Sequence, residues 1–516
     1  MSASLLKSSG VVGSMTLLSR VLGFVRDVIF ASAFGAGAAM DAFLIALKIP
    51  NFGRRMFAEG AFSQAFVPVF TETKTTGTQA EARDLAAVVM GTLAGVLALI
   101  TLVGCVSAPL LIWVFAPGFG SDPQKHALGT ELLRWTFPYL MFISLTALVS
   151  GVLNSYGRFA VPAFTPVILN LCLIATAFID AGSVHLLAYA VFVAGILQFA
   201  FQLPALRSLG LLSRPRWAWR DSRVRRIINL MLPVMIGSSV AQVSLLMDSA
   251  LASFLGDGAV SWLYYADRLM EFPLGIFSIA VGTVILPALS AHHATRSVDA
   301  FSHTLDWGLR TILLIGVPAA LGLVLFSGPL VATLFGYGAF DARDVQMTTY
   351  ALWAYGAGFM GFSLVKVLVP GFYARQETRV PVRYGIISLC CGMAISLTVF
   401  AAARWFELPA AHAGLAAATS SSAWINALLL LRRLRRDDAY RPAPGWAQFG
   451  LRLLLANLLM AALLLGFAGS LDAWLAMAGH ERALRVTATV AGAAALYFAC
   501  LGIVGMRPAH FRRTSL

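Results

Sequence analysis

Long apolar runs dominate the chain, and polar residues gather in the short stretches between them. A run of about 20 apolar residues is long enough to cross a bilayer as a helix. Such runs fall near residues 10–34, 40–69, 86–114, 132–154, 162–180, 185–206, 226–254, 260–290, 309–335, 347–373, 381–403, 410–431, 447–469 and 486–506. A helix satisfies its own backbone hydrogen bonds, so no run needs a strand partner inside a membrane. The pattern predicts an all-α polytopic membrane protein with about 14 transmembrane helices.

Composition supports this class and argues against an enzyme. Hydrophobic residues make up 59% of the chain and charged residues only 12%, which is outside the range of soluble globular proteins. The five cysteines all lie inside predicted helices without CxxC spacing, so neither a disulfide framework nor a zinc site is indicated. The eight histidines form no zinc motif or catalytic dyad.

Lysine and arginine positions predict the orientation. If the N-terminus is cytoplasmic, the connections on that side carry about 23 basic residues and those on the other side about five, as the positive-inside rule requires. Both termini should then be cytoplasmic. Much of the net charge of +14 is therefore a topology signal and not a nucleic-acid footprint.

The chain also contains an internal repeat at an offset of 219 to 221 residues. GAGA at 35–38 matches GDGA at 256–259, SAPL at 107–110 matches SGPL at 327–330, and VP at 161–162 matches VP at 380–381. The offset corresponds to six helices, so the halves should share one orientation and enclose a central cavity. We predict an N-lobe at 1–206, a basic inter-lobe linker at 207–225, a C-lobe at 226–431 and two extra helices within 447–506.

Charged residues inside the apolar runs mark where that cavity should lie. They are unevenly distributed, and the first, second, seventh and eighth runs hold most of them, namely Arg20, Arg26, Asp27, Asp41, Lys48, Arg54, Arg55, Glu59, Asp248, Asp267, Arg268 and Glu271. A charge at the bilayer centre costs about 2.5 to 3.5 kcal/mol on insertion scales, so these faces should line water and not lipid. The excess is cationic, and guanidinium groups bind phosphate oxygens in a bidentate manner, which predicts a phosphate-bearing substrate. The alternative is that the basic residues only neutralise Asp27, Asp41, Glu59 and Asp267.

Four segments carry a resemblance to a known family. SRVLGFVRD, FGAGAAMDAFLIALKIPNFGRRMFAEGAFSQAFVP, SWLYYADRLMEFPLGIF and KVLVPGFYARQETRVPV resemble the MurJ (MviN) lipid II flippases of the MOP exporter superfamily. The resemblance covers essentially the whole chain. It implies movement of undecaprenyl-pyrophosphate-linked disaccharide-pentapeptide from the inner to the outer leaflet of the bacterial cytoplasmic membrane, by alternating access, for cell-wall synthesis. It also implies a polyprenyl-tail groove along the last two helices.

The resemblance also implies particular site residues. Substrate binding falls on Arg20, Arg26, Arg54, Arg268, Lys48, Ser19 and Ser261, and gating or charge pairing on Asp27, Asp41 and Glu59. The pattern of charges inside the apolar runs adds Asp267 and Glu271 to the residues predicted for gating or charge pairing. The expected partners are lipid II, membrane lipids and cell-wall synthesis proteins, with no nucleic acid. We further predict that Arg26, Arg54 and Arg268 converge on one pyrophosphate. The runner-up function is export of another undecaprenyl-pyrophosphate-linked oligosaccharide.

Two further expectations concern ions and the linker. Asp248 is a weak candidate for a sodium ligand, but the eleventh run has no Asp, Glu or Asn beside it, so we expect no metal and no cofactor. Membrane potential, protons or a monovalent cation would drive the cycle. The seven arginines from Arg207 to Arg226 suggest a surface helix on anionic lipid, with topology alone as the alternative.

Overall fold

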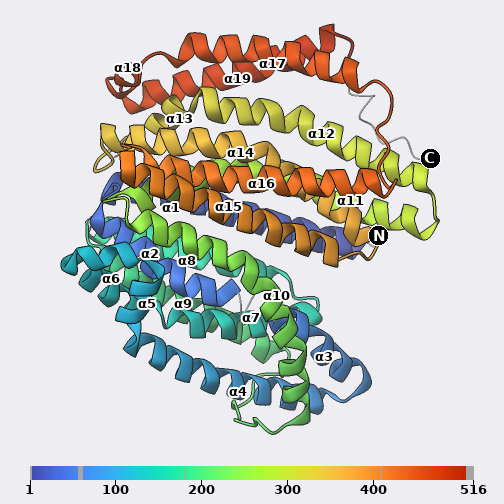
Figure 1. Ribbon diagram of the computed structural model, residues 1–516. Helices are drawn as coiled ribbons and strands as arrows, with labels where there is room; N and C mark the ends of the chain where they lie inside the picture. The colour runs from blue at the N-terminus through green and yellow to red at the C-terminus, as the bar shows by residue number, and fades with distance from the viewer. Residues whose placement is uncertain (1–2, 56–61, 181, 407, 507–516) are drawn as a thin grey trace. The chain divides into compact units, whose positions relative to one another are not determined.

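The computed structural model describes residues 3–55, 62–180, 182–406 and 408–506, and this part of the chain contains helices and no strands (Figure 1). The chain divides into two compact units, Met1–Ser261 and Trp262–Leu516. The boundary falls near the beginning of α11 (Ala259–Ala294), so the first three residues of that helix belong to unit 1.

Unit 1 is a bundle of helices of very different lengths. Its elements are α1 (Ala3–Phe34), α2 (Ala38–Arg54), α3 (Ser63–Thr76), α4 (Gln79–Val106), α5 (Ala108–Phe115), the 3-10 helix η2 (Pro117–Ser121), α6 (Pro123–Thr136), α7 (Tyr139–Ser155), α8 (Ala160–Ile179), α9 (Val184–Ser208) and α10 (Ser222–Ser253). α1 packs on α8, α8 and α7 pack on α9, and α2 packs on α6. Phe66, Phe70, Leu85 and Val149 lie in a buried core to which Ile227 of α10 also contributes. The amino-terminal end of α10 is therefore anchored on α3, α4 and α7.

Unit 2 contains α11 from Trp262 onward and the remaining helices. They are α12 (Val298–Leu325), α13 (Ser327–Leu334), α14 (Ala342–Ala374), α15 (Arg379–Phe406), α16 (Ala411–Arg436), α17 (Trp446–Ala468), α18 (Leu471–Leu475) and α19 (Gly479–Ile503). Within this unit α14 packs on α12 and α16, α15 packs on α16, and α17 packs on α12 and α19 (Figure 1). Leu305, Leu309, Val367 and Phe372 lie in its buried core.

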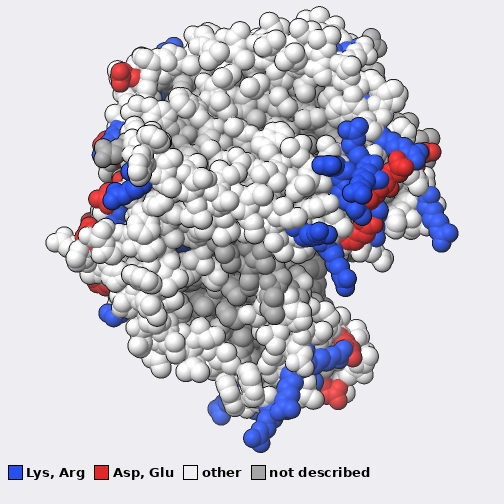
Figure 2. Space-filling view, in the orientation of Figure 1, with Lys and Arg blue, Asp and Glu red and all other residues white. Residues whose placement is uncertain are grey.

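The helical class predicted from the sequence is confirmed, and the chain is a multi-pass membrane protein. Within the described residues, ten helices are long and apolar enough to cross a membrane. The count of 14 remains a prediction. In the face that Figure 2 shows, each unit is uncharged across the middle of its helices, and charged side chains gather near helix ends. Exposed leucines such as Leu102 on α4 and Leu459 on α17 suit a surface that faces lipid chains.

Three predicted helices are divided in the structure, so those continuous segments were wrong. The run 86–114 is split at Ser107 into α4 and α5, and the run 309–335 is split at Phe326 into α12 and α13. The run 132–154 begins inside α6 and is divided at Phe137 and Pro138, after which α7 begins. Pro109, Pro138 and Pro329 lie beside the three breaks, and proline has no N–H with which to continue a helical ladder. The run 40–69 comprises α2 and α3, with residues 56–61 outside the described part.

The backbone repeats features at the offset of the sequence repeat. Gly35 and Gly256 both have positive φ, at 65° and 91°, and so do Gly157 and Gln376, at 73° and 60°. Asp122 caps α6 and Asp341 caps α14 with their side-chain oxygens. Because caps and left-handed residues depend on local backbone geometry, the two halves of the chain share local structure as well as sequence.

The inter-lobe linker differs from its prediction. Residues 209–221 form no helix, so a surface helix over the whole basic cluster was wrong. Instead the linker follows α4, where the Arg216 N–H donates to the Ala87 carbonyl at 3.1 Å and the Ala218 N–H donates to Thr92 Oγ1 at 3.1 Å. Pro215 lacks an N–H, and these backbone donors are used against α4 and not in a helix of their own.

Candidate functional site

A buried carboxylate, Asp41, accepts hydrogen bonds from several groups and is one of the predicted site residues. Asp41 lies in the first turn of α2 and has no exposed surface. Lys125 donates to it from Nζ at 3.0 Å, Ser261 donates from both Oγ at 2.7 Å and N at 2.9 Å, and the Gly258 N–H donates at 2.9 Å. A buried carboxylate needs this degree of satisfaction, because an uncompensated charge in a low-dielectric interior is costly.

Local backbone geometry places these donors. Asp122 caps α6 by accepting from the N–H groups of Gln124 and Lys125, which places Lys125 in the first turn of that helix. Gly256 and Gly258 both have φ of 91°, a conformation that favours glycine, and they form the turn that presents the Gly258 N–H. We call Asp41, Lys125, Gly258 and Ser261 the Asp41 hub.

Lys125 also has a second acidic partner. Its Nζ lies 2.8 Å from Asp257 Oδ1 and 4.5 Å from the centre of the Phe119 ring. The Asp257 side chain is 62% exposed, whereas that of Lys125 is 5% exposed. The pair with Asp41 is therefore the buried interaction, and the pair with Asp257 is solvated.

The hub brings together two residues that the family resemblance had assigned to different roles. Asp41 was predicted for gating and Ser261 for substrate binding, and here they bond directly. Lys125 and Asp257 were missed. Both lie between the predicted apolar runs, where a charge is ordinary, so nothing in the sequence marked them as partners of a carboxylate in the second apolar run.

Arg26 lies in a second polar cluster, between α1 and α8. Its Nε and Nη2 lie 3.0 and 2.7 Å from Asp27 Oδ1, and Nη1 donates to Asn170 Oδ1 at 3.1 Å. Asn170 Nδ2 in turn donates to the Ser19 carbonyl at 3.0 Å. Arg26, Asp27 and Asn170 are all buried, whereas Arg20 is exposed on α1. Asn170 was missed because a single amide in an apolar run carries little signal.

The basic residues of α2 contact amide and hydroxyl groups. Lys48 Nζ lies 2.5 Å from Ser249 Oγ of α10, and Arg54 Nε donates to Asn51 Oδ1 at 3.1 Å. Lys48 is exposed and Arg54 is partly buried. Glu59 lies outside the described residues, so its predicted role stays a prediction.

In unit 2, Arg268 lies on α11 beside an acid one turn away. Its Nη1 donates to Glu271 Oε2 at 2.9 Å, and its guanidinium lies 5.1 Å from the centre of the Tyr264 ring. Asp267 is partly buried on the same helix. Arg26 and Arg54 belong to unit 1 and Arg268 to unit 2, so their convergence on one pyrophosphate stays a prediction.

Trp262 begins unit 2 and forms a buried hydrogen bond. Its indole Nε1 donates to Asp344 Oδ1 at 2.8 Å, and its ring centre lies 4.9 Å from that of His412. At the offset of the sequence repeat, Trp262 corresponds to Asp41 and Asp344 corresponds to Lys125. The same two positions of the repeat are therefore in contact in each unit, through an ion pair in unit 1 and through an indole–carboxylate hydrogen bond in unit 2.

The chemistry of these clusters is that of binding and conformational contact. No three His, Cys, Asp or Glu side chains gather as a metal-binding group among the described residues. Whether Asp248 takes part in an ion site stays a prediction. The ion pairs and hydrogen bonds described above can break and re-form without covalent chemistry.

Comparisons with known proteins agree over nearly the whole chain. The family model described as lipid II flippase MurJ matches residues 30–481. A Vibrio cholerae protein described as a probable lipid II flippase MurJ is 45% identical over 517 residues, which cover 98% of this chain and 97% of that protein. The lipid II flippase MurJ of Burkholderia cenocepacia is 42% identical over 513 residues, covering 97% and 98% respectively.

Solved structures show the same similarity in three dimensions. A lipid II flippase MurJ in an inward closed conformation matches with a TM-score of 0.78 at 25% identity, covering 95% of this chain and 98% of that one. An inward-facing multidrug resistance MATE family transporter of the MOP superfamily matches with a TM-score of 0.66 at 14% identity, covering 83% and 98%. The second match shows a common fold only.

Proposed function

The chain belongs to the MurJ family of lipid II flippases, and we propose that it moves lipid II from the inner to the outer leaflet of the bacterial cytoplasmic membrane by alternating access. It is a transporter and not an enzyme. The observation that carries this function is 45% identity to a probable lipid II flippase over 98% of the chain. The buried and half-buried arginines of α1, α2 and α11 suit the pyrophosphate of that substrate.

The proposed topology places both termini in the cytoplasm. On this topology the beginnings of α2, α6 and α11 lie on the outer side of the membrane, because α1 crosses it once before α2 begins. The hydrogen bonds of the Asp41 hub would then hold the outer side closed in one of the two conformations of the cycle. Opening to that side would separate Asp41 from Ser261 and the Gly258 N–H, whereas Lys125, which like Asp41 belongs to the predicted N-lobe, would stay paired with it.

Lipid II supplies the bias between the two conformations. A ligand shifts a conformational equilibrium only through a difference in its affinity for the two states. We propose that Arg26, Arg54 and Arg268 bind the pyrophosphate, with Arg20, Lys48 and Ser19 around them, so that substrate contacts change as the hub breaks. The polyprenyl tail would follow α17 and α19.

The energy source and protein partners belong to the same proposal. We propose that no cofactor is required and that the membrane potential or a monovalent cation drives the return step. Cell-wall synthesis proteins on the outer side would take up the flipped lipid. Loss of outer-leaflet lipid II on collapse of the membrane potential, with lipid II synthesis unchanged, would support the first of these points.

Binding to purified full-length protein tests the substrate directly. Lipid II should bind in native mass spectrometry and should be displaced weakly by an undecaprenyl-pyrophosphate-linked O-antigen unit. Preferential binding of the O-antigen lipid would instead support the runner-up function. Equal binding of both would mean that only the pyrophosphate and the tail are recognised, which contradicts a dedicated lipid II flippase.

A further inference from the structure

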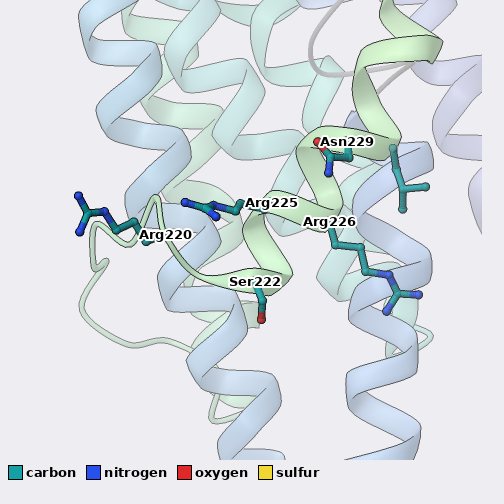
Figure 3. A pocket seen from close by; sticks show the side chains of 6 residues that line it. Arg220, Ser222, Arg225, Arg226 and Asn229 are labelled. Atoms are coloured by element: carbon teal, nitrogen blue, oxygen red, sulfur yellow. The ribbon is translucent and has the colours of Figure 1, made fainter.

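A basic groove lies at the beginning of α10, and none of the residues that line it is among those proposed to bind lipid II. It has a volume of about 410 Å³ and is lined by Arg220, Ser222, Arg225, Arg226, Asn229 and Leu230 (Figure 3). All six residues belong to unit 1. In Figure 3, Arg220 and Arg225 extend to one side of the first turns of α10, while Arg226 extends to the other.

The arginines around this groove fall into two groups. Arg216 and Arg223 both pair with Asp84 of α4, and Arg226 pairs with Glu72 at 2.9 Å. Among the described residues, Arg220 and Arg225 have no carboxylate partner. Structural pairing therefore accounts for three of these arginines and leaves two exposed cations on the groove.

Local contacts hold the groove in place. Asp221 caps α10 by accepting from the Arg223 N–H at 2.8 Å, and its carboxylate also receives Arg223 Nη2 at 2.8 Å. These hydrogen bonds, first that from the Arg223 side chain, lower the pKa of Asp221 below its ordinary value. Val224 and Ile227 on the opposite face are buried in the core of unit 1. The turn that carries Arg220 and Arg225 is thus built on a fixed support.

The surroundings are those of a membrane interface. Trp217 and Trp219 of the linker are stacked, with ring centres 6.2 Å apart, and are 60% and 46% exposed. Trp217 also packs over Gly95 of α4, where a side chain would collide with its ring. Exposed tryptophans near the end of membrane helices favour the headgroup level of a bilayer. Leu230, which lines the groove, is 46% exposed and offers it an apolar wall.

We propose that this groove binds the phosphate headgroup of an anionic membrane phospholipid on the cytoplasmic side. Arg220 and Arg225 supply charge-assisted donors to phosphate oxygens, and Ser222 and Asn229 are the neutral polar residues that also line the groove. Leu230 and the tryptophans contact the adjoining acyl chain. A topology signal needs only the number of positive charges, whereas this arrangement also provides a groove with polar donors and an apolar wall.

Its lining residues differ from those proposed to bind lipid II, and the site would let membrane composition affect the protein. An anionic headgroup bound here joins the linker to the beginning of α10. Because α10 extends from this groove to Ser249, which contacts Lys48, headgroup binding acts on a helix that also contacts α2.

The test compares two double variants of full-length protein that lose the same charge. Arg220→Gln with Arg225→Gln removes the unpaired cations of the groove, whereas Arg207→Gln with Arg214→Gln removes two exposed cations of the same segment that do not line it. Binding of phosphatidylglycerol, with phosphatidylcholine as the zwitterionic reference, is measured by native mass spectrometry. We expect the groove variant to weaken phosphatidylglycerol binding at least tenfold and the control variant to change it less than twofold.

Two further measurements keep the outcome decisive. Arg225→Lys retains the charge and loses the bidentate guanidinium, so its affinity for phosphatidylglycerol should lie between those of the wild type and the groove variant. Thermal unfolding should show that all variants are folded. Equal weakening by both double variants would show diffuse attraction and overturn the proposal. Weakened binding of lipid II in the groove variant, with phosphatidylglycerol binding unchanged, would assign the groove to the transported lipid and also overturn it. Intact lipid II flipping in the groove variant would leave the proposed function standing in either case.

Discussion

Ser261 donates two hydrogen bonds to Asp41, one from its hydroxyl at 2.7 Å and one from its backbone N–H at 2.9 Å, across 220 residues of sequence. The next residue, Trp262, donates to Asp344 of unit 2. Adjacent residues in the first turn of α11 therefore take part in polar contacts of different units. If the Asp41 hub breaks during transport, a movement of Ser261 would be passed through this turn to Trp262 and so to unit 2.

Removing the charge of Asp41 should destabilise the protein strongly. Asp41→Asn leaves the Lys125 ammonium without its buried partner, and breaking a buried pair from one side typically costs about 3 to 5 kcal/mol. We expect a large fall in the thermal unfolding midpoint of the purified protein. Asp257→Asn is the matched control, because it removes the solvated partner of the same lysine and should cost less than about 1 kcal/mol. Similar effects of the two variants would contradict the assignment of Asp41 as the centre of the hub.

Arg26 should be needed to bind the substrate as well as to neutralise the buried carboxylate of its neighbour Asp27. Arg26→Ala leaves Asp27 buried without its guanidinium partner, so the single variant confounds lost stability with lost binding. Arg26→Ala with Asp27→Ala removes both charges and should recover much of the stability but not lipid II binding, as measured by native mass spectrometry. Arg26→Lys should bind weakly, since it keeps the charge and loses the bidentate fork. Recovery of binding in the double variant would mean that Arg26 only neutralises Asp27.

Arg268 offers a cleaner separation because its ion pair is partly exposed. The side chains of Arg268 and Glu271 are 39% and 49% exposed, so losing their pairing should cost less than about 1 kcal/mol. Loss of one charge-assisted contact to pyrophosphate should cost about 2 kcal/mol, or roughly thirtyfold in binding. Arg268→Ala should therefore impair flipping, and Glu271→Gln should not. If Arg268→Ala with Glu271→Ala flipped normally, the arginine would have no role in binding the substrate.

Arg482 should hold α18 and α19 against α13. It is buried, and its guanidinium donates to the carbonyls of Leu475, Met477, Ala332 and Gly336 at 2.8 to 3.0 Å. Arg482→Ala leaves these carbonyls without that donor, and each unsatisfied buried group costs about 1 to 3 kcal/mol.

Limited proteolysis and thermal unfolding measure this effect. Arg482→Ala should expose the connection between α17 and α19 to protease and lower the unfolding midpoint. Arg485→Ala is the control, since Arg485 is exposed and lies over the Trp474 ring, an interaction of about 1 kcal/mol or less. Equal protease sensitivity of the two variants would show that Arg482 does not anchor this segment.

The helical class and the repeat could be read from the sequence because both depend on local patterns. Apolar runs indicate helices in a medium without water, and matched glycines such as Gly35 and Gly256 mark turns that need positive φ. The breaks at Ser107 and Phe326 were missed although proline follows each closely. A helix with a proline can bend or end, and only neighbouring contacts decide which.

The site residues were harder to predict than the helices. Charges inside apolar runs stand out, so Asp41 and Arg26 were predicted as site residues from the cost of a charge inside the membrane. Their partners were not predicted. Lys125 lies between two predicted apolar runs, where a lysine is ordinary, and Asn170 carries no charge. Glu271 pairs with Arg268 one turn along the same face of α11, where helical geometry brings side chains together, and pairing of Arg268 with Asp267 stays a prediction.

The most direct measurement of the central claim is the exposure of lipid II on the outer leaflet of cells depleted of their own lipid II flippase. Expression of this chain should restore both exposure and growth, and Arg268→Ala at the same membrane level should restore neither. The Burkholderia cenocepacia flippase serves as the positive control. Failure of this chain to restore lipid II exposure at a membrane level at which the control succeeds would contradict the account.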